Sequence, residues 1–135
     1  MTVAVAHQVS STSNRLALQL AAREAAQRGT DLAVLHIVDN LDLDVTEAYR
    51  SGLSEEVNGA LQAADATGLS WRLHLGVDKD DVAARILDLT GEVDAALLVI
   101  GARRRSPAGK FLLGSVTQTL ILEADVPVLV VKPPR

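Results

Sequence analysis

Cysteine is absent from this chain of 135 residues. The absence excludes disulfides, thiol catalysis, iron–sulfur clusters and zinc–thiolate sites. Hydrophobic residues make up 48% of the sequence and charged residues 22%. This balance is sufficient for an apolar core that needs neither a covalent link nor a structural metal. The sequence therefore predicts a single domain over residues 1–135, which is a usual domain length.

Aromatic residues are scarce as well: Tyr49, Trp71 and Phe111 are the only three. A surface that stacks nucleic-acid bases normally needs several of them. The net charge of −4 also opposes the basic field by which proteins bind nucleic acid or anionic membranes. We therefore expect neither nucleic acid nor membrane among the partners of this chain.

Long hydrophobic runs are missing too. The longest one, Ala95–Ile100, is far shorter than the roughly 20 residues that cross a bilayer. The first residues, MTVAVAHQ, have neither the cationic start nor the long apolar stretch of a signal peptide. Together with the lack of cysteine, these features predict a soluble protein of the cytoplasm.

What the sequence does contain is a regular alternation of strand and helix patterns. One apolar segment, Ser70–Leu75, alternates with polar residues as an edge strand does. Four others are nearly continuous, which is typical of strands buried on both faces. These four are Val3–Ala6, Leu32–Val38, Ala95–Ile100 and Pro127–Val131. Helical patterns lie between the strands, at Asn14–Gln27, Thr46–Ala66, Asp80–Thr90 and Val116–Ala124.

Capping residues mark the ends of these helices. The run from Ser10 to Ser13 predicts the start of the first helix, and Asp80 or Asp81 the start of the third. The ends of the first three helices are predicted at Gly29, Gly68 and Gly91.

The strict alternation of strand and helix predicts an α/β fold, an open five-stranded parallel sheet with helices on both faces. Such sheets bind ligands beyond the carboxyl ends of their strands, at the point where the strand order reverses. The two segments that follow Ala6 and Ile100 are therefore the candidates for a binding site.

The segment after Ile100, GARRRSPAGKFLLGSVTQTL, suits a phosphate group. Gly101 ends a buried strand, and Gly114 with Ser115 opens a helix, where free backbone N–H groups attract an anion. Positive charge comes from Arg103, Arg104, Arg105 and Lys110. Each feature alone also suits an ordinary turn, a helix boundary or a solvated surface, but their combination favours an anion site. It is not a P-loop, because no Gly-Lys-Ser/Thr closes it.

The spacing of this segment resembles the universal stress protein family. Members carry a glycine, two residues, a second glycine, nine residues, and then Gly-Ser or Gly-Thr. The matching positions here are Gly101, Arg104, Gly114 and Ser115. LAVLHIVD at 32–39 is similar to the family's second strand, and ADVPVLVVKP at 124–133 is similar to its last. The resemblance covers the whole chain.

The resemblance implies a Rossmann-like, HUP-type sheet in the order 3-2-1-4-5 and a homodimer joined through the last strand, here Val126–Val131. A subset of the family binds ATP, with the loop around the phosphates and ribose and strands 1 and 2 against the adenine. The implied ligand is ATP, with or without Mg²⁺. The implied binding residues are Ala6, His7, Gln8, Val38, Gly101, Arg103, Arg104, Gly114, Ser115 and Val116.

Two positions depart from the ATP-binding pattern. Arg104 stands at the second glycine, so a side chain replaces a close backbone approach or supplies a charged contact instead. Gln8 stands near the aspartate that ATP-binding members carry after strand 1. Loss of one charge-assisted contact, about 1.5–3 kcal/mol, weakens binding roughly 10- to 150-fold.

Other polar residues have simpler interpretations. His7, His36 and His74 could be neighbours in this strand order, but they lack metal-ligand spacing, and core or edge positions are the better interpretation. His7 is the exception, since it adjoins the expected binding site. The serines before the first helix are favoured as caps over a nucleophile, and Asp78, Asp80 and Asp81 as caps or solvated residues over a magnesium site.

The sequence thus predicts a nucleotide-binding stress regulator that acts through ligand-dependent contacts with a protein partner. It is not predicted to be an enzyme, because no residue pair resembles a general base beside an attacking water. Two alternatives remain open: a dimeric interaction module of the same fold without ATP binding, and a nucleotide-dependent transferase or hydrolase. The last ranks lowest, because the H-x-G-H signature of related adenylyl transferases is missing.

Overall fold

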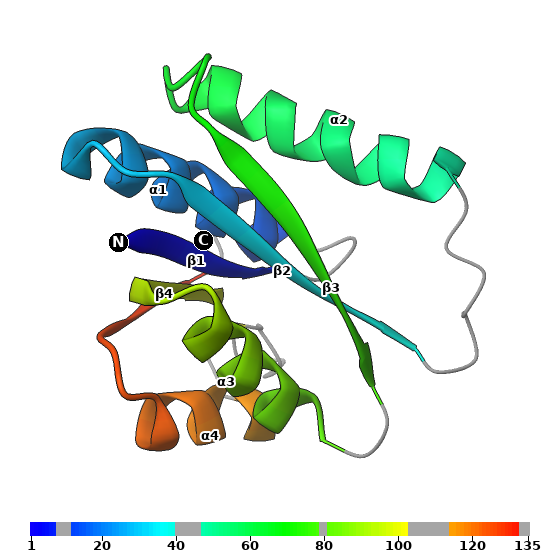
Figure 1. Cartoon of the computed structure of the whole chain (residues 1–135), viewed down its shortest axis with the longest axis vertical. Coiled ribbons are helices and arrows are strands. Elements are labelled where there is room, and N and C mark those ends of the chain that lie inside the picture. Colours follow the sequence, from blue (N-terminus) through cyan, green and yellow to red (C-terminus); the bar gives the residue numbers. More distant parts are fainter. Residues whose placement is uncertain (8–11, 40–46, 79–80, 103–113, 133–135) are drawn as a thin grey trace, which may run out of the picture.

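The computed structural model describes the chain except residues 8–11, 40–46, 79–80, 103–113 and 133–135 (Figure 1). Strands and helices alternate along the described residues. The strands are β1 (Thr2–His7), β2 (Leu32–Asp39), β3 (Trp71–Asp78), β4 (Ala95–Gly101) and β5 (Val128–Val131). The helices are α1 (Thr12–Arg28), α2 (Glu47–Ala63), α3 (Val82–Glu92) and α4 (Ser115–Glu123).

The five strands form one parallel sheet in the order β3-β2-β1-β4-β5. The α/β fold and this strand order confirm the prediction. β3 is an edge strand, as its alternating sequence indicated, and its side chains are less buried than those of the central strands. The central strand β1 is buried on both faces because helices cover each side.

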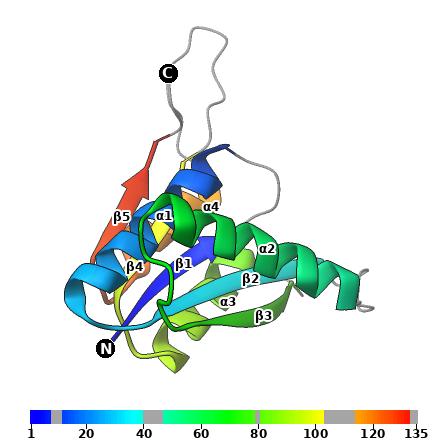
Figure 2. The same cartoon turned by 90° about the horizontal axis from the view of Figure 1, so that it is seen from above.

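Helices α1 and α2 cover one face of the sheet, and α3 and α4 cover the other (Figures 1 and 2). Successive side chains of a strand point to opposite faces. Val3 and Val5 of β1 therefore pack with α1 and α2, whereas Ala4 packs with α3 and α4. Two separate apolar cores result, one on each face.

The observed helix ends confirm some predicted caps and correct others. Gly29 follows α1 with a φ of +64°, a conformation that favours glycine. Asp81 is the N-cap of α3, and its carboxylate accepts a hydrogen bond from the Ala84 N–H at 3.2 Å. Gly91, however, lies within the last turn of α3, whose C-cap is Val93. A helix can include glycine at modest cost where the helix face is exposed.

The second helix is shorter than its sequence pattern suggested. It ends at Ala63, and Gly68, with a φ of +95°, belongs to the turn that leads into β3. Ala64 and Ala66 are buried in the core beside the helix, so their apolar character reflects packing of the turn. Of the serines predicted as caps for α1, Ser10 and Ser11 lie outside the described residues. No helix in the described part of the chain is both long and apolar enough to cross a membrane.

Candidate functional site

The strand order reverses between β1 and β4. The chain runs from β1 outward to β2 and β3 on one side, and from β4 outward to β5 on the other. The connections that follow β1 and β4 therefore lead to opposite faces of the sheet, and sheets of this kind bind ligands at the carboxyl ends of these strands. The two segments predicted from the sequence, after Ala6 and after Ile100, both start at this edge.

The β4 side of this edge is built around two glycines. Gly101 is the last residue of β4 and pairs with Val131 of β5. The next N–H group, that of Ala102, donates to the Val131 carbonyl at 2.8 Å and holds the strand end in place. Gly114 is the N-cap of α4, and its backbone has an extended conformation.

The first turn of α4 offers backbone donors. The first helical bond runs from the Gln118 N–H to the Gly114 carbonyl, at 3.0 Å. The N–H groups of Ser115, Val116 and Thr117 consequently precede any helical acceptor. Ser115 is exposed and Val116 packs against the apolar core under α4, so the core fixes the direction of this helix start. Such a helix start carries partial positive charge that attracts anions.

The predicted residues of β1 and β2 lie at the same edge but on two faces. Ala6 packs with the core under α3 and α4. His7 and Val38 are buried, 3% and 5% exposed. His7 was predicted to follow the first strand, but it is the last residue of β1. Gln8, Arg103 and Arg104, which the sequence analysis also assigned to the site, lie outside the described residues.

His7 takes part in a buried chain of hydrogen bonds. Its Nδ1 lies 3.1 Å from Nδ1 of His36, which is its register partner on β2. Its Nε2 lies 3.0 Å from a carboxylate oxygen of Glu56 on α2. His36 Nε2 lies 2.6 Å from the hydroxyl of Tyr49, also on α2. Burial, followed by the charge of His7, lowers the pKa of His36 below its ordinary value of 6.5.

The sequence alone does not mark Glu56 or Tyr49 as functional residues. They lie on α2, far along the chain from the strands that they contact. The one available signal is their spacing of seven residues, which places both on one face of a helix. Nothing in the sequence indicates that this face lies over the two histidines.

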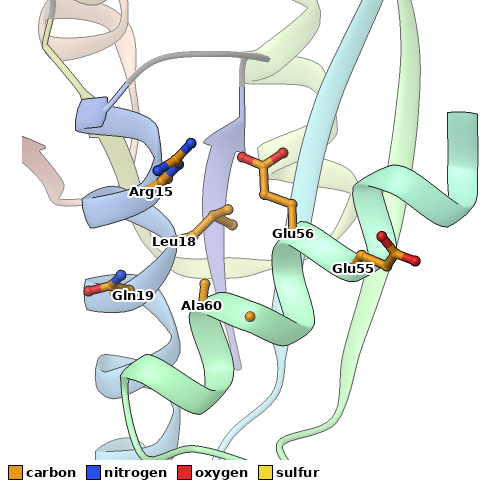
Figure 3. A pocket seen from close by; sticks show the side chains of 7 residues that line it. Arg15, Leu18, Gln19, Glu55, Glu56 and Ala60 are labelled. Carbon is orange, nitrogen blue, oxygen red and sulfur yellow. The ribbon is translucent and has the colours of Figure 1, made fainter.

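A groove of about 250 Å³ lies between α1 and α2. Arg15, Leu18 and Gln19 line it from α1, and Glu55, Glu56 and Ala60 from α2 (Figure 3). Glu56 thus faces two ways: its side chain is 29% exposed in the groove while it contacts the buried His7.

The three histidines do not form a metal site. His74 pairs with Leu35, whose side chain packs with α3, so His74 lies on the opposite face from His7 and His36. Within the described residues, no group of three or more His, Asp or Glu side chains is arranged to hold a metal ion. The interpretation of His36 as a satisfied core residue is confirmed.

An open parallel sheet in this order, with its reversal point between β1 and β4 and a glycine-capped helix after β4, defines a Rossmann-like α/β domain. The model of the universal stress protein family matches residues 1–132. The chain belongs to the universal stress protein family.

Individual relatives agree with this assignment. A universal stress protein of Mycolicibacterium smegmatis is 39% identical over 119 residues, which cover 88% of each chain. The solved structure of a universal stress protein from Archaeoglobus fulgidus is 32% identical, covers 98% of both chains and superposes with a TM-score of 0.76.

Two similar solved structures are described as nucleotide complexes. One is the Archaeoglobus fulgidus universal stress protein in complex with dAMP, 28% identical over 98% of both chains, with a TM-score of 0.71. The other is a universal stress protein in complex with cAMP, 27% identical over 99% of this chain and 98% of that one, with a TM-score of 0.75.

Proposed function

We propose that this chain binds an adenine nucleotide, ATP or a close analogue, and acts as a stress-response regulator in the cytoplasm. The single observation that carries the proposal is the glycine-capped start of α4, the helix that follows β4 at the reversal point of the sheet. The dAMP and cAMP complexes of two relatives support the nucleotide class. The functional unit is the single domain of residues 1–135.

The phosphates would bind at the start of α4. The N–H groups of Ser115 and Val116 and the Ser115 hydroxyl would donate to phosphate oxygens, and Gly101 and Gly114 would let the backbone approach them. Arg103 and Arg104 would add positive charge for the phosphates in a chain whose net charge is −4. Mg²⁺ would accompany ATP through the phosphates.

The adenine and ribose would lie over the ends of β1 and β2. Ala6, His7 and Val38 end or adjoin these strands, and Gln8 follows β1 with an amide that can accept from the adenine amino group. Because this amide carries no charge, the affinity is expected to be lower than in members with an aspartate there. Ligand binding would then change which surface the chain presents to a protein partner, without turnover of the nucleotide.

Calorimetric titration with Mg-ATP, AMP and cAMP tests the proposal. Gly114→Val should abolish binding, because a branched side chain at the N-cap blocks close approach of the phosphate. Gly91→Val is the matched control, since Gly91 is exposed on α3 and a side chain there would meet open space. The absence of heat and of thermal shift at millimolar nucleotide, or equal affinity in the Gly114 and Gly91 variants, would refute the proposal.

We further propose that the chain forms a homodimer through Val126–Val131. β5 is an edge strand, Leu129 is 36% exposed, and the segment VPVLVV carries no charge. Soluble proteins seldom leave such an edge unpaired, because its open N–H and C=O groups attract another strand. A two-fold axis lets the edge pair with its own copy. This surface also favours the alternative of an interaction module that functions without ATP.

Light scattering distinguishes the proposed dimer from a monomer. We expect twice the monomer mass of 14.3 kDa at tens of micromolar protein, and a monomer after Val128→Lys. Arg72→Ala, on the opposite edge strand β3, should leave the mass unchanged. A wild-type protein of monomer mass would overturn the dimer.

A further inference from the structure

The groove between α1 and α2 contains none of the residues proposed to bind the nucleotide (Figure 3). It lies where the two helices that cover one face of the sheet run side by side. Its volume of about 250 Å³ equals that of about eight water molecules in the liquid. A molecule the size of a small amino acid would fill this space, whereas drug-sized ligands need larger pockets.

The floor of the groove is apolar and its side chains are small. Leu18 is fully buried, and Ala60 is 6% exposed. Gly59 of α2 also lines the groove, and a Cβ added to it would meet no atom within 4 Å. The missing side chain of Gly59 therefore leaves space beside two apolar side chains. A short aliphatic group in this space would be removed from water.

The walls carry opposite charges near the same end of the groove. Figure 3 shows the Arg15 guanidinium on α1 and the Glu56 carboxylate on α2 across the groove from each other. Gln19 and Ala60 follow these two residues by four positions, so they lie about one helical turn further along. The side chain of Glu55 points away from α1 (Figure 3). One end of the groove is therefore charged on both walls, and the other end is uncharged.

Both charged groups are available to a ligand. Arg15 is exposed, and its side chain has no ion-pair or hydrogen-bond partner among the described residues. The Glu56 carboxylate bonds to His7 through Oε1, at 3.0 Å, and its second oxygen can accept from another donor. The Glu56 side chain is 29% exposed, so a molecule in the groove can reach it.

These two charges select the class of ligand. A guanidinium binds a carboxylate through two parallel N–H bonds, and a carboxylate binds an ammonium group through charge-assisted hydrogen bonds. A ligand with a single charge would pair with only one of the two walls. An α-amino acid carries both charged groups on one carbon atom. These groups can meet Arg15 and Glu56 at one end of the groove while the side chain extends toward Ala60.

We propose that the groove between α1 and α2 binds a free α-amino acid with a short aliphatic side chain, of about the size of valine. Arg15 binds its carboxylate, Glu56 binds its ammonium group, and the apolar floor contacts its side chain. This site shares no residue with the one proposed for the nucleotide, so either can fail without the other.

NMR titration of the isotope-labelled full chain with valine, without nucleotide, tests the site. Millimolar valine should shift the amide signals of groove residues such as Gln19 and Gly59 until they saturate. Isobutylamine lacks the carboxylate of valine, and isovalerate lacks its ammonium group. Each should bind at least about tenfold more weakly, which corresponds to the loss of one charge-assisted contact. No shift with valine, or equal affinity for either analogue, would overturn the proposal.

Gly59→Leu is the decisive variant, because its side chain would occupy the space intended for the ligand. Gly52→Leu is the matched control, since Gly52 is exposed on the same helix, has open space for a Cβ and does not line the groove. Valine binding should be lost in the first variant and retained in the second. Binding that survives Gly59→Leu would refute the assignment of the groove.

A second pair of variants tests the charge and does not depend on the folding of Gly59→Leu. Arg15→Gln should weaken valine binding at least about tenfold. Arg23→Gln, at an exposed arginine further along α1 and outside the groove, should leave it unchanged. Equal affinity in the two arginine variants would contradict the role of Arg15 in holding the carboxylate.

Discussion

The two faces of the sheet hold their helices in different ways. Under α3 and α4 the packing is apolar and close, and Gly76 of β3 leaves just enough space for Ile37 and Leu89. Under α2 the same sheet carries two buried histidines joined to a carboxylate and a hydroxyl. The apolar face is fixed by shape and the polar face by hydrogen bonds. The stability of the polar face therefore includes a contribution that depends on protons.

The largest expected effect lies on the apolar face. Leu98 is fully buried between the sheet and its helices, so Leu98→Ala removes transfer energy and leaves a cavity. We expect a loss of about 2–5 kcal/mol in the free energy of unfolding. Urea denaturation measures it. Leu122→Ala, at a side chain 82% exposed, should change stability by less than about 0.5 kcal/mol and serves as the control.

A smaller loss is expected where the same face is too tight for any side chain. A Cβ at Gly76 would lie 2.8 Å from Ile37 Cδ1 and 3.2 Å from Leu89 Cδ1. Gly76→Val should cost about 1–3 kcal/mol through overpacking. Gly52→Ala, where a Cβ meets open space on an exposed part of α2, should instead stabilise by up to about 1 kcal/mol. Equal stability of the Gly76 variant and the wild type would show that α3 adjusts easily.

The smallest expected effect is a pH dependence of the free energy of unfolding, which arises on the polar face. The pKa of His36 is lower in the folded than in the unfolded state, chiefly because of burial. The unfolded chain then binds a proton first as pH falls below about 6.5, so stability decreases toward acid by at most about 1.4 kcal/mol per pH unit. Below the folded pKa the decrease stops. The hydrogen bond from Thr2 lowers the pKa of Asp31 below 3.8. Asp31 therefore loses its contribution to stability only in more acidic solutions.

Urea denaturation at several pH values from about 7.5 to about 5 measures this slope. His36→Gln should flatten it, and His74→Gln should leave it unchanged. A slope that is the same in all three proteins would assign the pH dependence to other groups. Leu98→Ala should lower stability equally at every pH, because no titratable group is involved, and this parallel shift sharpens the contrast between the faces.

The sequence by itself determined the class of fold. Continuous apolar strands alternating with helical patterns have few compact arrangements, and a parallel sheet with helices on both faces is the one that buries all of them. The same local patterns located every strand and helix to within a few residues. The helix ends were predicted less well. Gly91 and Gly68 do not mark the ends of α3 and α2, because glycine also occurs inside helices and in turns.

The edge at which we propose nucleotide binding could be located from the sequence, because Gly114 adjoins Ser115 along the chain and the reversal point follows from the strand order. The hydrogen bonds that join His7 and His36 to Glu56 and Tyr49 could not be predicted from the sequence. His7 and His36 meet because β1 and β2 pair in register, and Glu56 and Tyr49 reach them because α2 crosses over those strand ends. Such contacts depend on register and helix placement, which the whole core sets. No local pattern encodes them, so only the tertiary structure decided that these four residues form one hydrogen-bonded path.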